Sequence, residues 1–145
     1  MDKVIVNIGN KTYNCQLAKT EEEHKQGLMN VEYLAPDEGM LFEFEKEGTH
    51  EFWMKNTSLE LTQISINDDD EVEYVYQAIP NDETLIPFEN CKYLLEVNRT
   101  TDIHTIDWPV KCYTTKLQLN NILNDLSIKG FLQIHLLRAV VDKII

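Results

Sequence analysis

Basic residues and glycine are scarce in this chain of 145 residues. There are 13 Lys and Arg against 25 Asp and Glu, so the formal net charge is −12. A chain this acidic repels phosphate groups, which argues against binding to nucleic acid or to an anionic membrane. Only five glycines are present, and no GxGxxG, Walker A or GxSxG pattern occurs. The common motifs for nucleotide binding and for serine hydrolysis are therefore absent.

Cysteines and long apolar runs are also few. Cys15, Cys91 and Cys112 form no CxxC pair and no zinc-binding spacing, so we interpret them as reduced thiols and expect neither a metal nor another cofactor. No apolar run reaches the roughly 18 residues that a membrane-spanning helix needs. The first residues lack the basic and then apolar layout of a secretory leader. We therefore expect a cytoplasmic protein, or a virion protein if a phage encodes it.

What the chain does contain is a series of short β-rich runs separated by turn residues. The runs pair as three predicted hairpins, with turns at Gly9-Asn10, Glu47-Gly48 and Asn67–Asp70; their strands are 4–8 with 12–17, 40–45 with 50–55, and 61–66 with 71–78. Residues 79–91 read as a loop and 92–97 as a further strand. This spacing predicts an α+β domain that is mainly β, with an antiparallel sheet curled into a barrel-like shape.

One short helix is predicted after the first hairpin. Thr20 can accept a hydrogen bond at the N-terminus, and Glu23, three residues later, can complete a capping box. Gly27 can end the helix after two or three turns.

The pattern changes near residue 114. Leu119, Ile122, Leu123 and Leu126 have the spacing of one helix face, and 131–145 is apolar almost all round. A strand over 131–137 is an alternative. Residues 1–110 carry a net charge of −15 and 111–145 carry +3. We therefore predict a β-rich domain over 1–113 and a helical C-terminal extension over 114–145.

Four motifs resemble those of the domain-of-unknown-function 192 family. They are Gly27-Leu28-Met29, Leu34 to Phe42 (LAPDEGMLF), Phe52 to Thr57 (FWMKNT) and Leu95 to Asn98 (LEVN). The resemblance covers residues from about 12 to 98 and implies a compact β-rich domain with a short helix, but no activity. Two charges usual in the family are missing here, because Val31 replaces a basic residue and Thr62 an aspartate. The loss of these two charges fits a family member whose role is structural.

The candidate site residues fall into two groups. Trp53 and Lys55 share one face of a predicted strand, and with Asn56, Glu96 and Asn98 they form a candidate groove for a ligand or partner. The alternative for the aromatic residue is ordinary core packing. The C-terminal extension offers apolar residues for docking onto a partner, namely Phe131, Ile134, Leu137, Val141 and Ile145.

These patterns favour a non-catalytic interaction or structural module within a larger assembly, of which a phage particle is one example. Its partners would be other protein subunits, or further copies of itself, held through 114–145. The alternative hypothesis is a domain that binds a small polar ligand, or an enzyme, with its site in the groove near Trp53. Packing of the extension on its own domain is equally open at this point.

Overall fold

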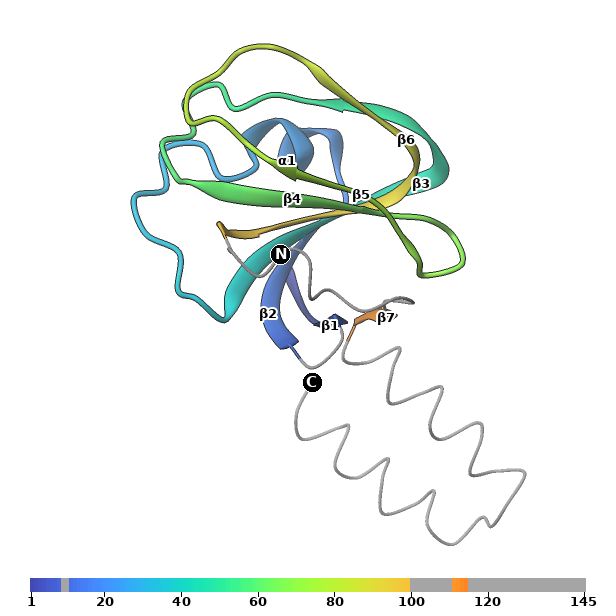
Figure 1. Ribbon diagram of the computed structural model, residues 1–145. Helices are drawn as coiled ribbons and strands as arrows, with labels where there is room; N and C mark the ends of the chain where they lie inside the picture. The colour runs from blue at the N-terminus through green and yellow to red at the C-terminus, as the bar shows by residue number, and fades with distance from the viewer. Residues whose placement is uncertain (9–10, 100–110, 115–145) are drawn as a thin grey trace, which may run out of the picture. The chain divides into compact units, whose positions relative to one another are not determined.

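The computed structural model describes residues 1–8, 11–99 and 111–114, which are mainly strands with one short helix (Figure 1). In chain order the elements are β1 (Asp2–Ile8), β2 (Lys11–Ala18), α1 (Glu21–Gln26), β3 (Glu38–Phe52), β4 (Leu61–Ile66), β5 (Val72–Gln77), β6 (Ile86–Asn98) and β7 (Lys111–Thr114). The mainly β class and the single short helix in this region are thus confirmed. The predicted C-terminal helices lie outside the described residues.

The strands form one mixed sheet with the order β5-β4-β6-β3-β2-β1-β7. Within the described part of the chain β5 and β7 are its two ends, so the barrel-like closure that the sequence predicted is wrong. The expectation of a wholly antiparallel sheet is wrong as well, since β2 and β3 are parallel, with Asn14 opposite Glu38 and Ala18 opposite Phe42. The chain between them includes α1. That crossover returns β3 beside β2 in the same direction, as a tight hairpin could not.

Strand β3 corrects another prediction. The sequence predicted two strands joined by a turn at Glu47-Gly48, but β3 runs on as one strand along β6, from Gly39 opposite Val97 to Phe52 opposite Ile86. Two shifts in register lie near Gly48. The ammonium of Lys92 donates to the carbonyl oxygens of Phe44 and Glu45, at 2.6 and 2.9 Å, and so holds the irregular part of β3 against β6. β6 itself begins within the predicted loop 79–91.

The other two predicted hairpins are confirmed. β1 and β2 pair from Asp2 opposite Leu17 to Ile8 opposite Lys11. β4 and β5 pair around the turn that begins at Asn67. None of the described helices has the length and apolar character needed to cross a membrane.

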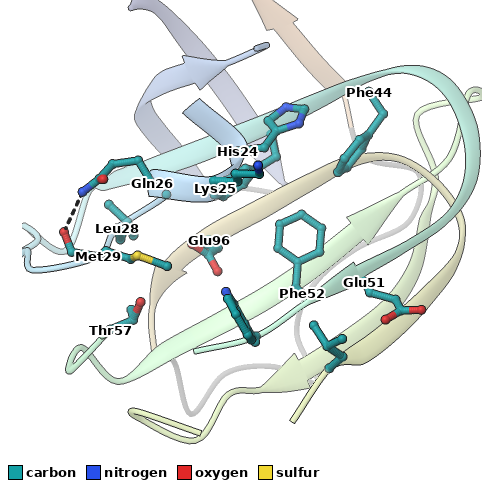
Figure 2. A pocket seen from close by; sticks show the side chains of 14 residues that line it. His24, Lys25, Gln26, Leu28, Met29, Phe44, Glu51, Phe52, Thr57 and Glu96 are labelled. Atoms are coloured by element: carbon teal, nitrogen blue, oxygen red, sulfur yellow. Dashed lines mark hydrogen bonds between the residues drawn. The ribbon is translucent and has the colours of Figure 1, made fainter. Parts of the chain in front are cut away.

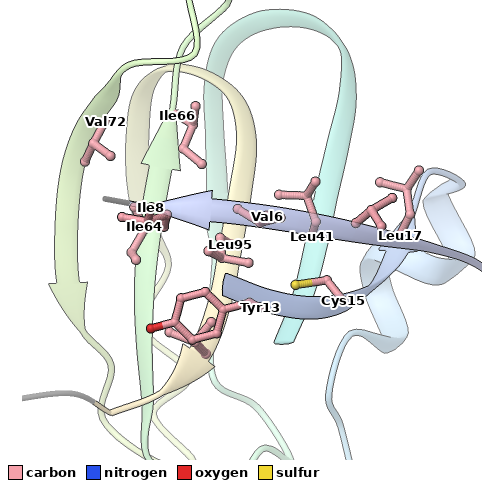
Figure 3. Packing of buried hydrophobic residues seen from close by; sticks show 12 residues of the cluster. Val6, Ile8, Tyr13, Cys15, Leu17, Leu41, Ile64, Ile66, Val72 and Leu95 are labelled. Atoms are coloured by element: carbon pink, nitrogen blue, oxygen red, sulfur yellow. The ribbon is translucent and has the colours of Figure 1, made fainter. Parts of the chain in front are cut away.

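Two apolar clusters form the core. The β1-side cluster contains buried residues of β1 to β6 (Figure 3), namely Val4, Val6, Ile8, Tyr13, Cys15, Leu17, Leu41, Ile64, Ile66, Val72, Leu95 and Val97. The α1-side cluster contains Ala18, Leu28, Leu34, Met40, Phe42, Met54, Leu61, Ala78, Phe88, Cys91 and Leu94. Successive residues of β3 and β6 alternate between the clusters, because side chains of a strand alternate between the two faces of a sheet.

Candidate functional site

A cavity of about 260 Å³ opens beside α1, on the side of the α1-side cluster. Figure 2 shows its side chains converging from α1, from the turn that follows it, from the end of β3 and from β6. The lining residues are His24, Lys25, Gln26, Gly27, Leu28, Met29, Phe42, Phe44, Glu51, Phe52, Trp53, Thr57, Leu85 and Glu96. Most of this surface is apolar or aromatic, as is typical of small-molecule sites.

Helix α1 forms one wall, and the predicted capping box fixes where it begins. The backbone N–H of Glu23 donates to the Thr20 hydroxyl at 3.1 Å, and the carboxylate of Glu23 accepts from the backbone N–H of Thr20 at 3.0 Å. At the other end Gly27 has a φ of +45°. A Cβ atom there would lie 3.3 Å from the ring of Phe42, so glycine allows the end of α1 to approach β3 closely.

An aromatic group forms the wall next to α1. The ring centroid of Phe52 lies 5.1 Å from that of Phe42 and 5.8 Å from that of Phe44, both in edge-to-face geometry. The ring of His24 lies 4.8 Å from that of Phe44. Nε2 of His24 donates to the carbonyl oxygen of Ala18 at 2.9 Å, because a carbonyl oxygen can only accept. This hydrogen bond orients the histidine ring between helix and sheet.

Glu96 is the polar group at the base of the cavity, and it is only 4% exposed. Its neighbours in the sheet are Met40 on β3 and Gln63 on β4. The amide of Gln63 donates to Oε2 of Glu96 at 2.8 Å and also approaches the sulfur of Met54 at 3.9 Å. No buried side-chain nitrogen or oxygen of the described residues lacks a hydrogen-bond partner, and Glu96 is one of the residues that line the cavity.

Burial raises the pKa of Glu96 from its ordinary value of 4.5 to about 7, and the hydrogen bond from Gln63 opposes part of that rise. No basic side chain of the described residues contributes to this pKa. A carboxyl group with a raised pKa at the base of a cavity is a common mark of a functional site.

Thr57 supplies a second polar atom to the cavity. It is buried, and its hydroxyl donates to the carbonyl oxygen of Lys55 at 3.0 Å. The hydroxyl oxygen keeps its lone pairs, which can still accept a hydrogen bond.

The predicted groove residues divide between this cavity and its surroundings. Trp53 and Glu96 line the cavity, whereas Lys55, Asn56 and Asn98 do not. Trp53 lies just after β3 rather than within a strand and is 39% exposed, and the ammonium of Lys55 lies 5.2 Å from the centroid of its ring.

The two predicted asparagines connect loops. Asn56 has a φ of +53°, and its carbonyl oxygen accepts from the backbone N–H of Asn30. The side-chain amide of Asn98 donates to the carbonyl oxygen of Leu34. The five predicted docking residues, Phe131, Ile134, Leu137, Val141 and Ile145, lie outside the described residues.

Sequence reasoning missed His24, Thr57 and Gln63. Only Gln63 carried a usable signal, since a glutamine inside the strand 61–66 is unusual when that strand is buried throughout. Its side chain needs a buried partner, and Glu96 is that partner.

Thiol and metal chemistry find little support in the described residues. Cys15 and Cys91 are free and buried, and burial raises the pKa of each thiol to about 12, so neither is a thiolate near neutral pH. Within the same residues no three His, Cys, Asp or Glu side chains gather closely enough to hold a metal ion.

Residues 4–105 match the model of the DUF192 family, described as an uncharacterized ACR. The chain belongs to the DUF192 family. Each of the four motifs noted in the sequence contributes to the cavity wall, through Leu28, Phe42, Trp53 and Glu96 among others. Val31 packs against the α1-side cluster, and buried Thr62 donates to the side-chain oxygen of Gln77 at 2.7 Å. Both departures from the family pattern are thus accommodated within the fold.

Two solved structures resemble the chain. One is a protein of unknown function from Novosphingobium aromaticivorans, with 30% sequence identity and a TM-score of 0.68; the match covers 77% of this chain and 83% of that one. The other, from Sinorhizobium meliloti, is a suggested transcription regulator, with 28% identity and a TM-score of 0.69 over 78% of this chain and 92% of that one. No protein with a curated description matches the chain.

Proposed function

We propose that this DUF192 domain binds a small molecule in the cavity beside α1. The observation that supports this most directly is the carboxyl group of Glu96, which is almost fully buried yet reaches an open cavity. Burying an ionisable group without a charged partner is costly, so such a group is usually retained for a purpose other than stability. A ligand that bonds to Glu96 would supply that purpose.

The chemistry of the lining favours an amphiphilic ligand over a wholly polar one. Phe44, Phe52, Leu28 and Leu85 offer apolar contacts, while Glu96 lies at the base. Apolar walls with a few convergent polar groups bind a ligand and fix its orientation. The volume of about 260 Å³ limits the occupant to a small molecule.

The hypothesis of a partner-docking module held through 114–145 stays a prediction, because its residues lie outside the described ones. The same holds for membership of a larger assembly such as a phage particle.

Binding can be tested by nuclear magnetic resonance with the full-length, ¹⁵N-labelled protein. We expect small aromatic and aliphatic fragments to shift the backbone amide signals of residues 24–29, 52–57 and 96. The Met29→Trp variant should lose these shifts, because a larger side chain would fill the space that Met29 borders (Figure 2).

Tyr33→Trp is the matched control, since Tyr33 is 75% exposed and does not line the cavity. It should leave the ligand-induced shifts unchanged. The proposal fails if fragments of every charge type leave these signals unmoved, or if Met29→Trp binds them as well as the unchanged protein does.

A further inference from the structure

The buried polar side chains beside Glu96, Gln63 and Thr57, have already donated their hydrogens. The amide nitrogen of Gln63 directs its two hydrogens to Glu96 and to the sulfur of Met54. The hydroxyl hydrogen of Thr57 goes to the carbonyl oxygen of Lys55. Once Glu96 is ionised, these two groups offer the cavity only acceptor capacity, at the carboxylate of Glu96 and at the oxygen of Thr57. A matching ligand group must therefore supply several hydrogens.

The charge at the base is negative and lacks a cation. Gln63 is neutral, and neither Lys25 nor Lys55 contributes to the pKa of Glu96. Lys25 is exposed on α1, and the ammonium of Lys55 lies over the outer aromatic ring of Trp53. A carboxylate buried in this way gains strongly from a positively charged hydrogen-bond donor, because such bonds are shorter and about twice as strong as neutral ones.

Three other ionisable residues line the cavity. His24 and Lys25 come from α1, and Glu51 comes from β3, where it is exposed. None of them contributes to the pKa of Glu96. The carboxyl of Glu96 is thus the principal charge that a bound molecule would meet at the base.

The cavity walls favour a ligand that has an apolar part and an attached cationic group. Phe52 and Trp53 present aromatic rings, whose faces attract cations, and Leu28 and Met29 add aliphatic surface. An apolar cavity of ~150 Å³ is known to hold benzene. At about 260 Å³, this cavity has room for one ring and a short substituent.

We propose that the ligand is a small primary amine, bound as its ammonium ion, whose nitrogen donates to Glu96 and Thr57 while one ring or a short alkyl chain lies among Phe52, Trp53 and Leu28. This inference rests on the proposed function, and it adds the chemical class of the ligand.

The test compares benzylamine, benzyl alcohol and benzoate, which share one ring and differ in the charge of the attached group. Affinities are measured at pH 8 by calorimetry, with amide shifts recorded on the full-length protein. Primary amines are protonated at this pH, and Glu96 is ionised. We expect benzylamine to bind roughly tenfold or more tightly than benzyl alcohol, and benzoate to bind most weakly.

The decisive variant is Glu96→Gln, which keeps the size of the side chain and removes its charge. It should weaken benzylamine binding by roughly tenfold or more and leave benzyl alcohol within about twofold. Glu89→Gln is the matched control, because Glu89 is exposed on the same strand and does not line the cavity. It changes the net charge by the same amount and should alter neither affinity. Retained binding of benzyl alcohol shows that Glu96→Gln is folded.

The outcomes separate the two proposals. If benzyl alcohol or benzoate binds as well as benzylamine, or if Glu96→Gln binds benzylamine unchanged, the amine class is overturned while ligand binding stands. If the Glu89→Gln variant loses affinity as Glu96→Gln does, the effect comes from net charge and the amine class is again overturned. If none of the three compounds binds and the fragment screen also finds nothing, both proposals fall.

Discussion

At the scale of single residues, Glu96 and Gln63 form the least ordinary contact in the protein. Two buried polar side chains meet across β6 and β4, joined by one hydrogen bond of 2.8 Å. Buried polar groups are normally satisfied or absent, and a carboxyl group with only an amide partner is expensive to ionise. The pair therefore ties the stability of the domain to the protonation of Glu96.

This coupling gives a prediction about pH. In the unfolded chain Glu96 ionises near 4.5, whereas in the folded protein it keeps its proton up to about 7. The folded state thus binds more protons between these values, and the contribution of Glu96 to stability is present below pH 4.5 and is lost as the pH rises to 7. The loss is on the order of 3 kcal/mol.

The measurement is urea unfolding of the unchanged protein and of Glu96→Gln across pH 4.5 to 8. Because every other titratable group, His24 included, is common to both proteins, the difference in their free energies of unfolding isolates Glu96. We expect Glu96→Gln to gain stability relative to the unchanged protein as the pH rises. A difference that stays constant with pH would contradict the raised pKa.

Sequence reasoning found part of this site and missed the rest for a physical reason. Trp53 and Glu96 were predicted to contribute to a groove, and both line the cavity. Lys55 was grouped with Trp53 because residues two apart on a strand share a face, but β3 ends at Phe52. Asn98 lies at the end of β6, and its side chain donates to the carbonyl oxygen of Leu34 instead. Gln63 lies 33 positions from Glu96 along the chain. Only the register between β4 and β6 brings them together.

At the scale of elements, β3 shows how closely the strands approach one another. Gly39 lies between Cys15 of β2 and Val97 of β6. A Cβ atom on it would lie 2.7 Å from the backbone oxygen of Glu96 and 3.1 Å from the sulfur of Cys15. Backbone cannot give way as a long side chain can, so this position requires glycine.

Gly39→Ala should therefore destabilise the domain by about 1–3 kcal/mol, the usual cost of overpacking a core. Gly48→Ala is the matched control on the same strand, because the nearest atom to its added Cβ is 3.8 Å away, an ordinary contact. We expect that change to be neutral or slightly stabilising. Denaturant unfolding measures both variants, and equal losses of stability would contradict this account of β3.

The elements differ in how well the sequence predicted them. The capping box of α1 was read correctly because Thr20 and Glu23 act within a single turn. The single strand β3 was read as a hairpin because the glycine at position 48 is a typical turn residue. What keeps the strand continuous is a pairing with β6, supported by Lys92, whose bonds to β3 span more than 40 residues of sequence. Local patterns do not contain that information.

At the scale of the whole molecule, the two apolar clusters together draw on residues from Val4 to Val97 within the described part of the chain. The family match covers nearly the same segment, 4–105. These residues hold the buried apolar surface that stabilises the sheet and shapes the cavity.

A chain ending after Thr114, which keeps β7, should consequently remain folded. We expect it to unfold in a single cooperative transition and to bind the same fragments as the full-length protein, by denaturant titration and amide shifts. A truncated chain without a cooperative transition would show that the domain depends on 115–145. If sedimentation finds an assembly of the full-length protein that the truncated chain lacks, the partner-docking hypothesis gains its first support.

The place of β6 in the sheet also decides when the protein can fold during its own synthesis. β6 is the sixth strand to leave the ribosome, yet it pairs with both β3 and β4, which are not neighbours in the sheet. A nascent chain that has released only the first five strands holds two separate pieces, β1 to β3 and the β4–β5 hairpin. The sheet joins, and Glu96 reaches its position beside Gln63, only when residues 86–98 emerge. Until then the apolar surfaces that β6 will cover remain open to water and to chaperones.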